Sequence, residues 1–159
     1  MQIKIISISL MAEIFGYMVT WTTYGSWLQG DKRGFVRDGQ TLQGDERMLR
    51  LCKNSQKGTT VKLKKEEKTA VKTAILNEAE RIGQKLHALA VFSNHIHIAA
   101  RPCDKPIERI VSMYKSAATR ALRYYGRGEK IWTKGFDKRF CFTEDDFNVK
   151  IAYIRNHEN

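Results

Sequence analysis

Residues 86–100 read LHALAVFSNHIHIAA, and this stretch decides the predicted fold class. It holds two runs of mostly apolar residues, separated by Ser93 and Asn94, which are residue types that favour turns. The pattern predicts two strands joined by a tight turn. Arg101 and Pro102 follow, and the proline ends the second strand because it cannot donate a ladder hydrogen bond.

Two further strands are predicted outside this pair. Residues 16–24, GYMVTWTTY, are β-branched and aromatic with rough alternation, and residues 138–142, KRFCF, form a shorter run. Between the first strand and the next element, residues 25–62 carry many glycines and scattered charges. We expect a long irregular segment there, with one short helix over residues 46–52.

Helices are predicted from apolar periodicity and from end signals. The clearest covers residues 63–85, whose apolar residues fall on one face and which ends near Gly83. A second covers residues 104–125, with Asp104 as its N-cap. A last helix begins after Thr143, which is a good N-cap because acidic residues follow it in the first turn.

The order of the elements is strand, loop, helix, strand, strand, helix, strand, helix. This order predicts the α+β class, as a ferredoxin-like antiparallel sheet with helices packed on one face. No repeat or linker interrupts the sequence, and its 159 residues suit one domain of about 150 residues. We therefore expect one domain over residues 1–159, in which residues 1–12 are an extension that need not be ordered.

The composition favours a polyanionic partner. The chain has 28 Lys and Arg against 17 Asp and Glu, a net charge of +11, which in a compact domain points first to nucleic acid. No window reaches the roughly 18 unbroken apolar residues of a membrane span, and the N-terminus lacks a signal-peptide cleavage site. Three distant cysteines without a CxxC pair fit a reducing compartment. We expect a cytoplasmic protein with no membrane role.

The sharpest chemical feature is the run His95-Ile96-His97. Because side chains alternate along a strand, both imidazoles point to one face of the sheet. Two parallel histidines on a rigid strand can act as a preformed pair of metal ligands. The alternative is two half-exposed histidines with no ligand. His87, on the neighbouring strand, is interpreted as a structural or surface histidine.

A second feature is Tyr153 with His157 on the last helix. The two are four residues apart, so they share a face of the helix. A phenol beside an imidazole could be a nucleophile beside a third metal ligand. The alternative is that Tyr153 belongs to the core, since Ile151 and Ile154 are close to it in sequence.

A third feature is the basic stretch over residues 101–139. It has 11 Lys or Arg against 4 acidic residues, and aromatic residues are interleaved with them. Bases stack on such rings while cations hold phosphates, so the stretch could bind nucleic acid. The alternative is a solvated helix whose aromatic residues pack inward. The candidate DNA-binding residues are Lys115, Arg120, Arg123, Lys134, Lys138 and Arg139.

Four segments of the chain, in order, resemble one known family. Residues 91–102, VFSNHIHIAARP, are similar to its His-hydrophobic-His strand, and residues 113–126, MYKSAATRALRYYG, to its Lys-Ser-x-x-T-x-x-L helix. Residues 20–36, TWTTYGSWLQGDKRGFV, resemble the opening of one subgroup. Residues 131–159 resemble its Trp-containing strand and its tyrosine-bearing terminal helix. The family is the single-tyrosine HUH transposases, which include insertion-sequence enzymes and REP-associated tyrosine transposases.

The resemblance implies a ferredoxin-like fold, a divalent metal (Mg²⁺ or Mn²⁺) and an enzyme that cleaves and rejoins single-stranded DNA through a 5′-phosphotyrosine. By position, His95 and His97 match the metal-binding histidines, and Tyr153 matches the nucleophile. His157 stands where relatives often have Gln or Asn that helps to hold the metal. This is a departure from the family pattern, although a histidine can also be a ligand.

The resemblance also implies partners. One is single-stranded DNA that forms a hairpin. The other is a second copy of this chain in a homodimer, in which the tyrosine of one copy acts with the histidines of the other. Relatives commonly continue beyond this helix, so we expect the helix that ends near Asn159 to be poorly anchored. Two other functions stay open: a non-catalytic nucleic-acid-binding module on the same fold, and a small zinc-dependent hydrolase using His95, His97 and His157. The DNA sequence recognised and present mobility are not predicted.

Other catalytic patterns are missing from the sequence. It has no GxSxG, no P-loop, no HExxH and no Rossmann glycine pattern. The paired histidines and the tyrosine therefore carry the prediction of an enzyme.

Overall fold

A computed structural model describes residues 13–26, 35–37, 40–55, 60–128 and 130–158. The predicted extension over residues 1–12 lies outside them, as does part of the segment that resembles the opening of the transposase subgroup. None of the helices in these ranges is long and apolar enough to cross a membrane.

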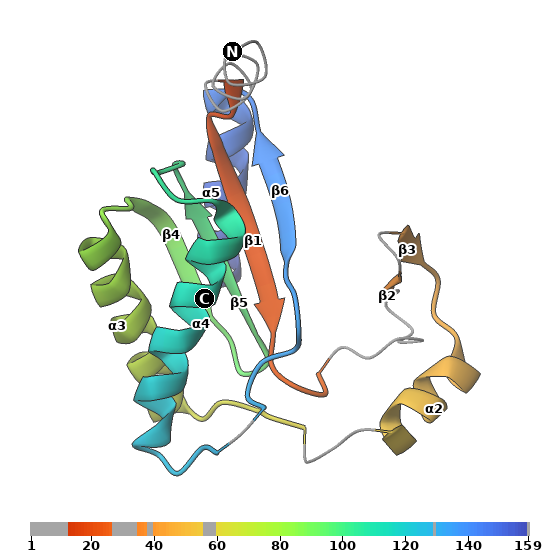
Figure 1. Ribbon diagram of the computed structural model, residues 1–159. Helices are drawn as coiled ribbons and strands as arrows, with labels where there is room; N and C mark the ends of the chain where they lie inside the picture. The colour runs from red at the N-terminus through yellow and green to blue at the C-terminus, as the bar shows by residue number, and fades with distance from the viewer. Residues whose placement is uncertain (1–12, 27–34, 38–39, 56–59, 129, 159) are drawn as a thin grey trace, which may run out of the picture.

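The centre of the described structure is a four-stranded antiparallel sheet in the order β4-β5-β1-β6 (Figure 1). Its strands are β1 (Gly16–Thr22), β4 (Leu86–Val91), β5 (His95–Ala100) and β6 (Asp137–Cys141). Each of the four was predicted. With the helices between them, the elements follow the β-α-β-β-α-β order of the ferredoxin-like fold, and the predicted α+β class is confirmed.

One face of the sheet is covered by α3 (Lys65–Ile82) and α4 (Ile107–Arg123), which lie side by side in Figure 1. Alternation along β1 turns Tyr17, Val19 and Trp21 toward this face, where they join the main core. The two helices contribute buried aliphatic and aromatic side chains: Val71, Ile75, Ala79, Ile82, Ile110, Val111, Tyr114, Ala118 and Leu122. This is the arrangement that the sequence predicted for these helices.

The last helix, α5 (Glu144–His157), lies against the opposite face of the sheet, behind the strands in Figure 1. Prediction placed helices on one face, which holds for α3 and α4 but not for α5. The sheet accepts α5 because this face carries small residues, and Phe147 and Ile154 pack there in a second, smaller core. Gly16 lets the helix approach closely, since a Cβ at that position would lie 2.6 Å from the Phe147 ring.

The helix ends show which local signals were reliable. Thr143 caps α5 through a 3.1 Å bond in which its Oγ1 accepts from the amide of Asp146, as predicted. Gly83 ends α3 in the left-handed region at φ +73°, also as predicted. The prediction of Asp104 as the cap of α4 was wrong. Pro106 occupies that position without a side-chain bond, because its fixed φ of −65° already suits a helix start.

The described parts of the glycine-containing segment after β1 hold more regular structure than predicted. It includes the expected short helix, α2 (Glu46–Ser55). It also includes an unpredicted hairpin of β2 (Phe35–Arg37) and β3 (Gln40–Leu42). Strands of three residues are too short to show a readable alternation, which explains why the sequence did not reveal them.

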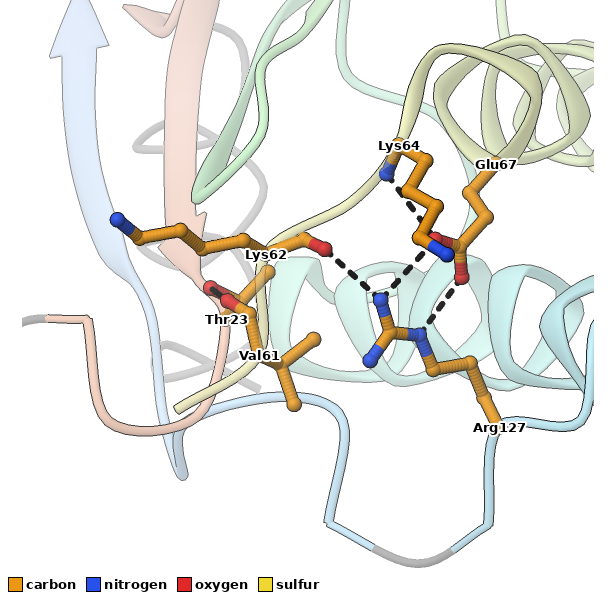
Figure 2. A network of polar contacts seen from close by, with 6 residues as sticks. All are labelled: Thr23, Val61, Lys62, Lys64, Glu67 and Arg127. Carbon is orange, nitrogen blue, oxygen red and sulfur yellow. Dashed lines mark hydrogen bonds and ion pairs between the residues drawn. The ribbon is translucent and has the colours of Figure 1, made fainter. Parts of the chain in front are cut away.

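The end of this segment is fastened to the main core by a polar network (Figure 2). The Thr23 hydroxyl donates to the carbonyl of Val61 at 2.6 Å. The Arg127 guanidinium donates to the carbonyl of Lys62 and forms an ion pair of 2.6 Å with Glu67 at the start of α3. Glu67 is buried, and its hydrogen bond from Arg127 holds the pKa of its carboxyl below the usual range.

Candidate active site

The two predicted metal-binding histidines lie on β5, on the face of the sheet that α5 covers. The ring centroids of His95 and His97 are 4.7 Å apart. His97 is buried, and His95 is half-buried with the Phe92 ring stacked on it at 4.4 Å. The shared direction predicted from strand alternation is what the structure has.

A neighbouring oxygen orients each imidazole. His95 Nδ1 lies 2.7 Å from Asn94 Oδ1, and His97 Nδ1 lies 2.7 Å from Thr20 Oγ1. An amide oxygen only accepts, so Nδ1 of His95 is the donor in this bond. The Thr20 hydroxyl can accept in the same way from His97. Metal-binding histidines usually have this arrangement, in which an oxygen partner on one nitrogen fixes the tautomer.

The protonation state of His97 suits a ligand. Burial, together with the neighbouring charges of His95 and His157, lowers the pKa of His97 to about 4, while Asp137 acts in the opposite direction. The ring is therefore neutral at neutral pH. A neutral imidazole is the form that binds a metal ion.

Tyr153 comes to this pair from α5. Its ring centroid lies 5.8 Å from that of His97 and 4.1 Å from that of His157. Tyr153 is 44% exposed, whereas the next residue, Ile154, is fully buried. The core position on this turn of the helix is thus filled by Ile154, and the phenol lies at the surface beside the histidines.

His157 lies beside the phenol, four residues further along α5. Its Nδ1 lies 2.7 Å from the Tyr153 carbonyl oxygen. In the described part of the chain, no group of three or more His, Cys, Asp or Glu side chains is arranged to hold a metal ion. The donor chemistry of His95 and His97 fits a divalent cation, and its remaining ligands would come from substrate, solvent or a shift of His157.

The terminal helix is well anchored, contrary to prediction. Phe147 and Ile154 are buried against the sheet. Arg155 donates to the carbonyl of His87 at 3.1 Å, and Glu158 forms an ion pair of 2.5 Å with Lys72 of α3. These contacts hold Tyr153 near His97 of the same chain.

The basic residues predicted to bind DNA fall in two places. Lys115, Arg120, Arg123 and Lys134 line a groove of about 640 Å³ between α4 and residues 132–136. Trp132 also lines the groove, half-buried, and its Nε1 donates to Thr119 at 3.0 Å. Since α4 covers the face of the sheet opposite α5, this groove is separate from the histidine pair.

Within the groove, Lys115 differs from the other cations. Its Nζ donates to the carbonyls of Thr133 (3.1 Å) and Gly135 (2.7 Å), and burial lowers its pKa. It therefore holds the loop that forms one wall of the groove. Arg120, Arg123 and Lys134 are exposed and available to a ligand.

The other two predicted DNA-binding residues lie on opposite faces of β6. Lys138 is opposite Val19, on the α4 face, and forms a 3.0 Å ion pair with Glu108. Arg139 is opposite Met18, on the histidine face, and its Nε donates to Asp137 Oδ2 at 3.2 Å. Alternation along the strand therefore gives these neighbours different surroundings.

Sequence reasoning missed Thr20, Asn94 and Asp137. Asn94 directly precedes the histidine pair, and its amide was a readable signal. Thr20 is opposite His97 only because β1 pairs with β5, which no local pattern reveals. Asp137 lies in the same cross-strand row, opposite Thr20 on its other side. The His87 ring packs edge-on against the Phe147 ring, with centroids 5.1 Å apart. This contact agrees with the interpretation of His87 as a structural histidine.

The chain matches no family model and no curated protein, whereas solved structures share its fold. One is a REP-associated tyrosine transposase bound to a REP hairpin, with a TM-score of 0.53 and 13% identity over 91% of this chain and 67% of that chain. Another is a candidate transposase from Deinococcus radiodurans R1, with a TM-score of 0.46 and 15% identity over 91% of this chain and 92% of that chain. At 13% identity, the match to the REP-associated transposase shows a similar fold.

Proposed function

We propose that this protein is a metal-dependent transposase that cleaves and rejoins single-stranded DNA with Tyr153 as its nucleophile. The observation that carries the proposal is the position of the Tyr153 ring, 5.8 Å from the His97 ring. A half-exposed phenol brought by a helix to two oriented imidazoles is what tyrosine-based strand cleavage needs. A zinc-dependent hydrolase would activate water and has no use for this phenol.

In the proposed step, Tyr153 Oη forms a bond to phosphorus as the bond from phosphorus to the 3′-oxygen breaks. The phenol loses its proton, the departing oxygen gains one, and the DNA stays attached through a 5′-phosphotyrosine. A 3′-hydroxyl of another strand can reverse the step and rejoin DNA without ATP. A phenol is a weak nucleophile at neutral pH because its reference pKa is about 10.

His95 and His97 would hold a divalent cation, with His157 as the proposed third ligand beside Tyr153. Such an ion, Mg²⁺ or Mn²⁺, supplies Lewis-acid stabilisation of the phosphate charge when bound. Imidazole ligands suit Mn²⁺ better than Mg²⁺. The oxygen contacts of Asn94 and Thr20 keep both rings oriented for this role.

The proposed substrate is single-stranded DNA with a hairpin, since the solved REP-associated transposase is bound to a REP hairpin. Arg120, Arg123 and Lys134 in the α4 groove would contact phosphates, and the indole ring of Trp132 would be a stacking partner for a base. The close approach of Tyr153 to His97 within one chain supports cleavage in cis, with or without a homodimer. We place this function in the cytoplasm.

The test uses a pool of hairpin-forming single strands with random flanking sequence, labelled at the 3′ end and incubated with the protein and either Mn²⁺ or Mg²⁺. A 5′-phosphotyrosine retains the 3′ portion of the DNA, so a labelled adduct should survive a denaturing gel, whereas a 5′ label should be released. Tyr153→Phe should bind the same DNA and form no adduct. Peptide mapping of the adduct to Tyr124 or Tyr125, which are also exposed, would overturn the assignment.

The second candidate is a nucleic-acid-binding module without catalysis. The α4 groove favours it, because its three exposed cations are separate from the histidine pair. This function predicts DNA binding that depends on Arg120 and Arg123 and does not change when His97 is replaced. Binding without any adduct, in either metal, would favour the module over the transposase.

A further inference from the structure

The face of the sheet that carries His95 and His97 also carries a row of polar side chains that no sequence motif indicated. In register across the sheet, His97 of β5 is opposite Thr20 of β1, and Thr20 is opposite Asp137 of β6. These three side chains therefore share a row and a face. Tyr153 reaches His97 from α5, which contacts the sheet mainly at β4. Asp137 ends the row on β6, at the opposite edge of the sheet.

The distances across this row suit a phosphate group. Neighbouring strands are about 4.8 Å apart, so His97 and Asp137 are separated by roughly two strand spacings. Thr20 lies between them and is half-buried, with its hydroxyl bonded to His97. A phosphate above Thr20 would be within reach of groups from both neighbouring strands.

Arg139 is the cation that can reach that position. It is two residues beyond Asp137 on β6, hence on the same face, and its bond to Asp137 bends the guanidinium back toward the His97 row. That bond uses the Nε–H, while the two Nη groups carry the other four donors in a rigid fork suited to phosphate. The ion pair also balances the Asp137 charge, which would otherwise repel a phosphate.

We propose that Arg139 is a clamp for the phosphate that Tyr153 attacks and that Asp137 is the positioning residue of this clamp. The proposal rests on the proposed function, and it assigns to Arg139 a role in the chemical step instead of general affinity for DNA. Lys138, its neighbour on the strand, has no such role because it faces α4 and pairs with Glu108.

The test measures single-turnover adduct formation at saturating single-stranded DNA, with DNA affinity measured separately by anisotropy. Arg139→Ala should lower the rate about 10- to 100-fold, the worth of a charge-assisted hydrogen bond, and should change affinity about threefold or less, because it is one of several phosphate contacts. Arg139→Lys should recover part of the rate, since it restores the charge without the fork. Arg81→Ala is the matched control, as its side chain is 63% exposed against 62% for Arg139 and is also paired with a carboxylate.

Asp137→Asn should lower the rate less than Arg139→Ala and leave the affinity nearly unchanged. The double variant should react no more slowly than Arg139→Ala alone, because Asp137 acts through Arg139. Three results would overturn the clamp and leave the transposase function standing. They are a double variant whose rate loss is the product of the two single losses, an unchanged rate in Arg139→Ala, and an equal rate loss in Arg81→Ala. If the wild type forms no adduct, the proposed function fails and the clamp fails with it.

Discussion

Replacing Gly16 by alanine tests how closely α5 must lie on the sheet. The added Cβ would be 2.6 Å from two carbons of the Phe147 ring and 3.0 Å from a third. Phe147 is 1% exposed and has little room to move. Overpacking of this kind lowers the free energy of unfolding by about 1–3 kcal/mol. The lower chain entropy of alanine in the unfolded state offsets about 0.4–1 kcal/mol of that loss. We expect a net destabilisation of about 1–2 kcal/mol.

Urea unfolding of the wild type, Gly16→Ala, Phe147→Leu and the double variant measures this effect as a double-mutant cycle. A smaller side chain at Phe147 removes the ring that the new methyl meets, so the double variant should be more stable than the sum of the single effects predicts. Gly16→Ala should also slow adduct formation, because Phe147 and Tyr153 are on the same helix. A neutral or stabilising Gly16→Ala, or strict additivity in the cycle, would refute the reasoning.

Three further outcomes are expected. His97→Ala should abolish adduct formation and, since the buried ring is bonded to Thr20, should destabilise the fold by about 0.5–3 kcal/mol; a wild-type rate in this variant would contradict the ligand role. The logarithm of DNA affinity should fall with log[salt] at about −0.7 per phosphate contact, and a flat dependence would remove the electrostatic argument. Because the pKa of Glu67 is lowered in the folded state, wild-type stability should fall as pH drops from about 4.5 through that pKa; Glu67→Gln should be less stable at neutral pH and lose less in this window.

The sequence predicted the elements whose signals are local. Alternation and turn residues revealed the four strands of the main sheet, and a single hydroxyl at Thr143 marked the start of the last helix. Alternation also placed His95 and His97 on one face. The same rule applied to KRF at 138–140 separates Lys138 from Arg139, although the prediction grouped both as DNA-binding residues without distinguishing their faces.

Contacts between distant segments could not be read in this way. The bond from His97 to Thr20 joins residues 77 positions apart, and only the pairing of β1 with β5 brings them together. The face taken by α5 was equally hidden, because both faces of the sheet carry apolar residues. What decides it is size: alanines at positions 88, 90 and 99 leave room for a helix that brings a phenylalanine.

The helix that carries the proposed nucleophile is therefore the least deeply packed of the described helices on the sheet. Its buried residues are Phe147 and Ile154, while α3 and α4 each contribute at least four aliphatic or aromatic side chains to the main core. Since the free energy of local opening follows buried apolar contact, α5 should open at lower cost than β5. Hydrogen exchange should therefore show α5 amides opening well below the global free energy of unfolding, and more so in Gly16→Ala. Equal protection of α5 and β5 would mean that Tyr153 separates from His97 only when the whole protein unfolds.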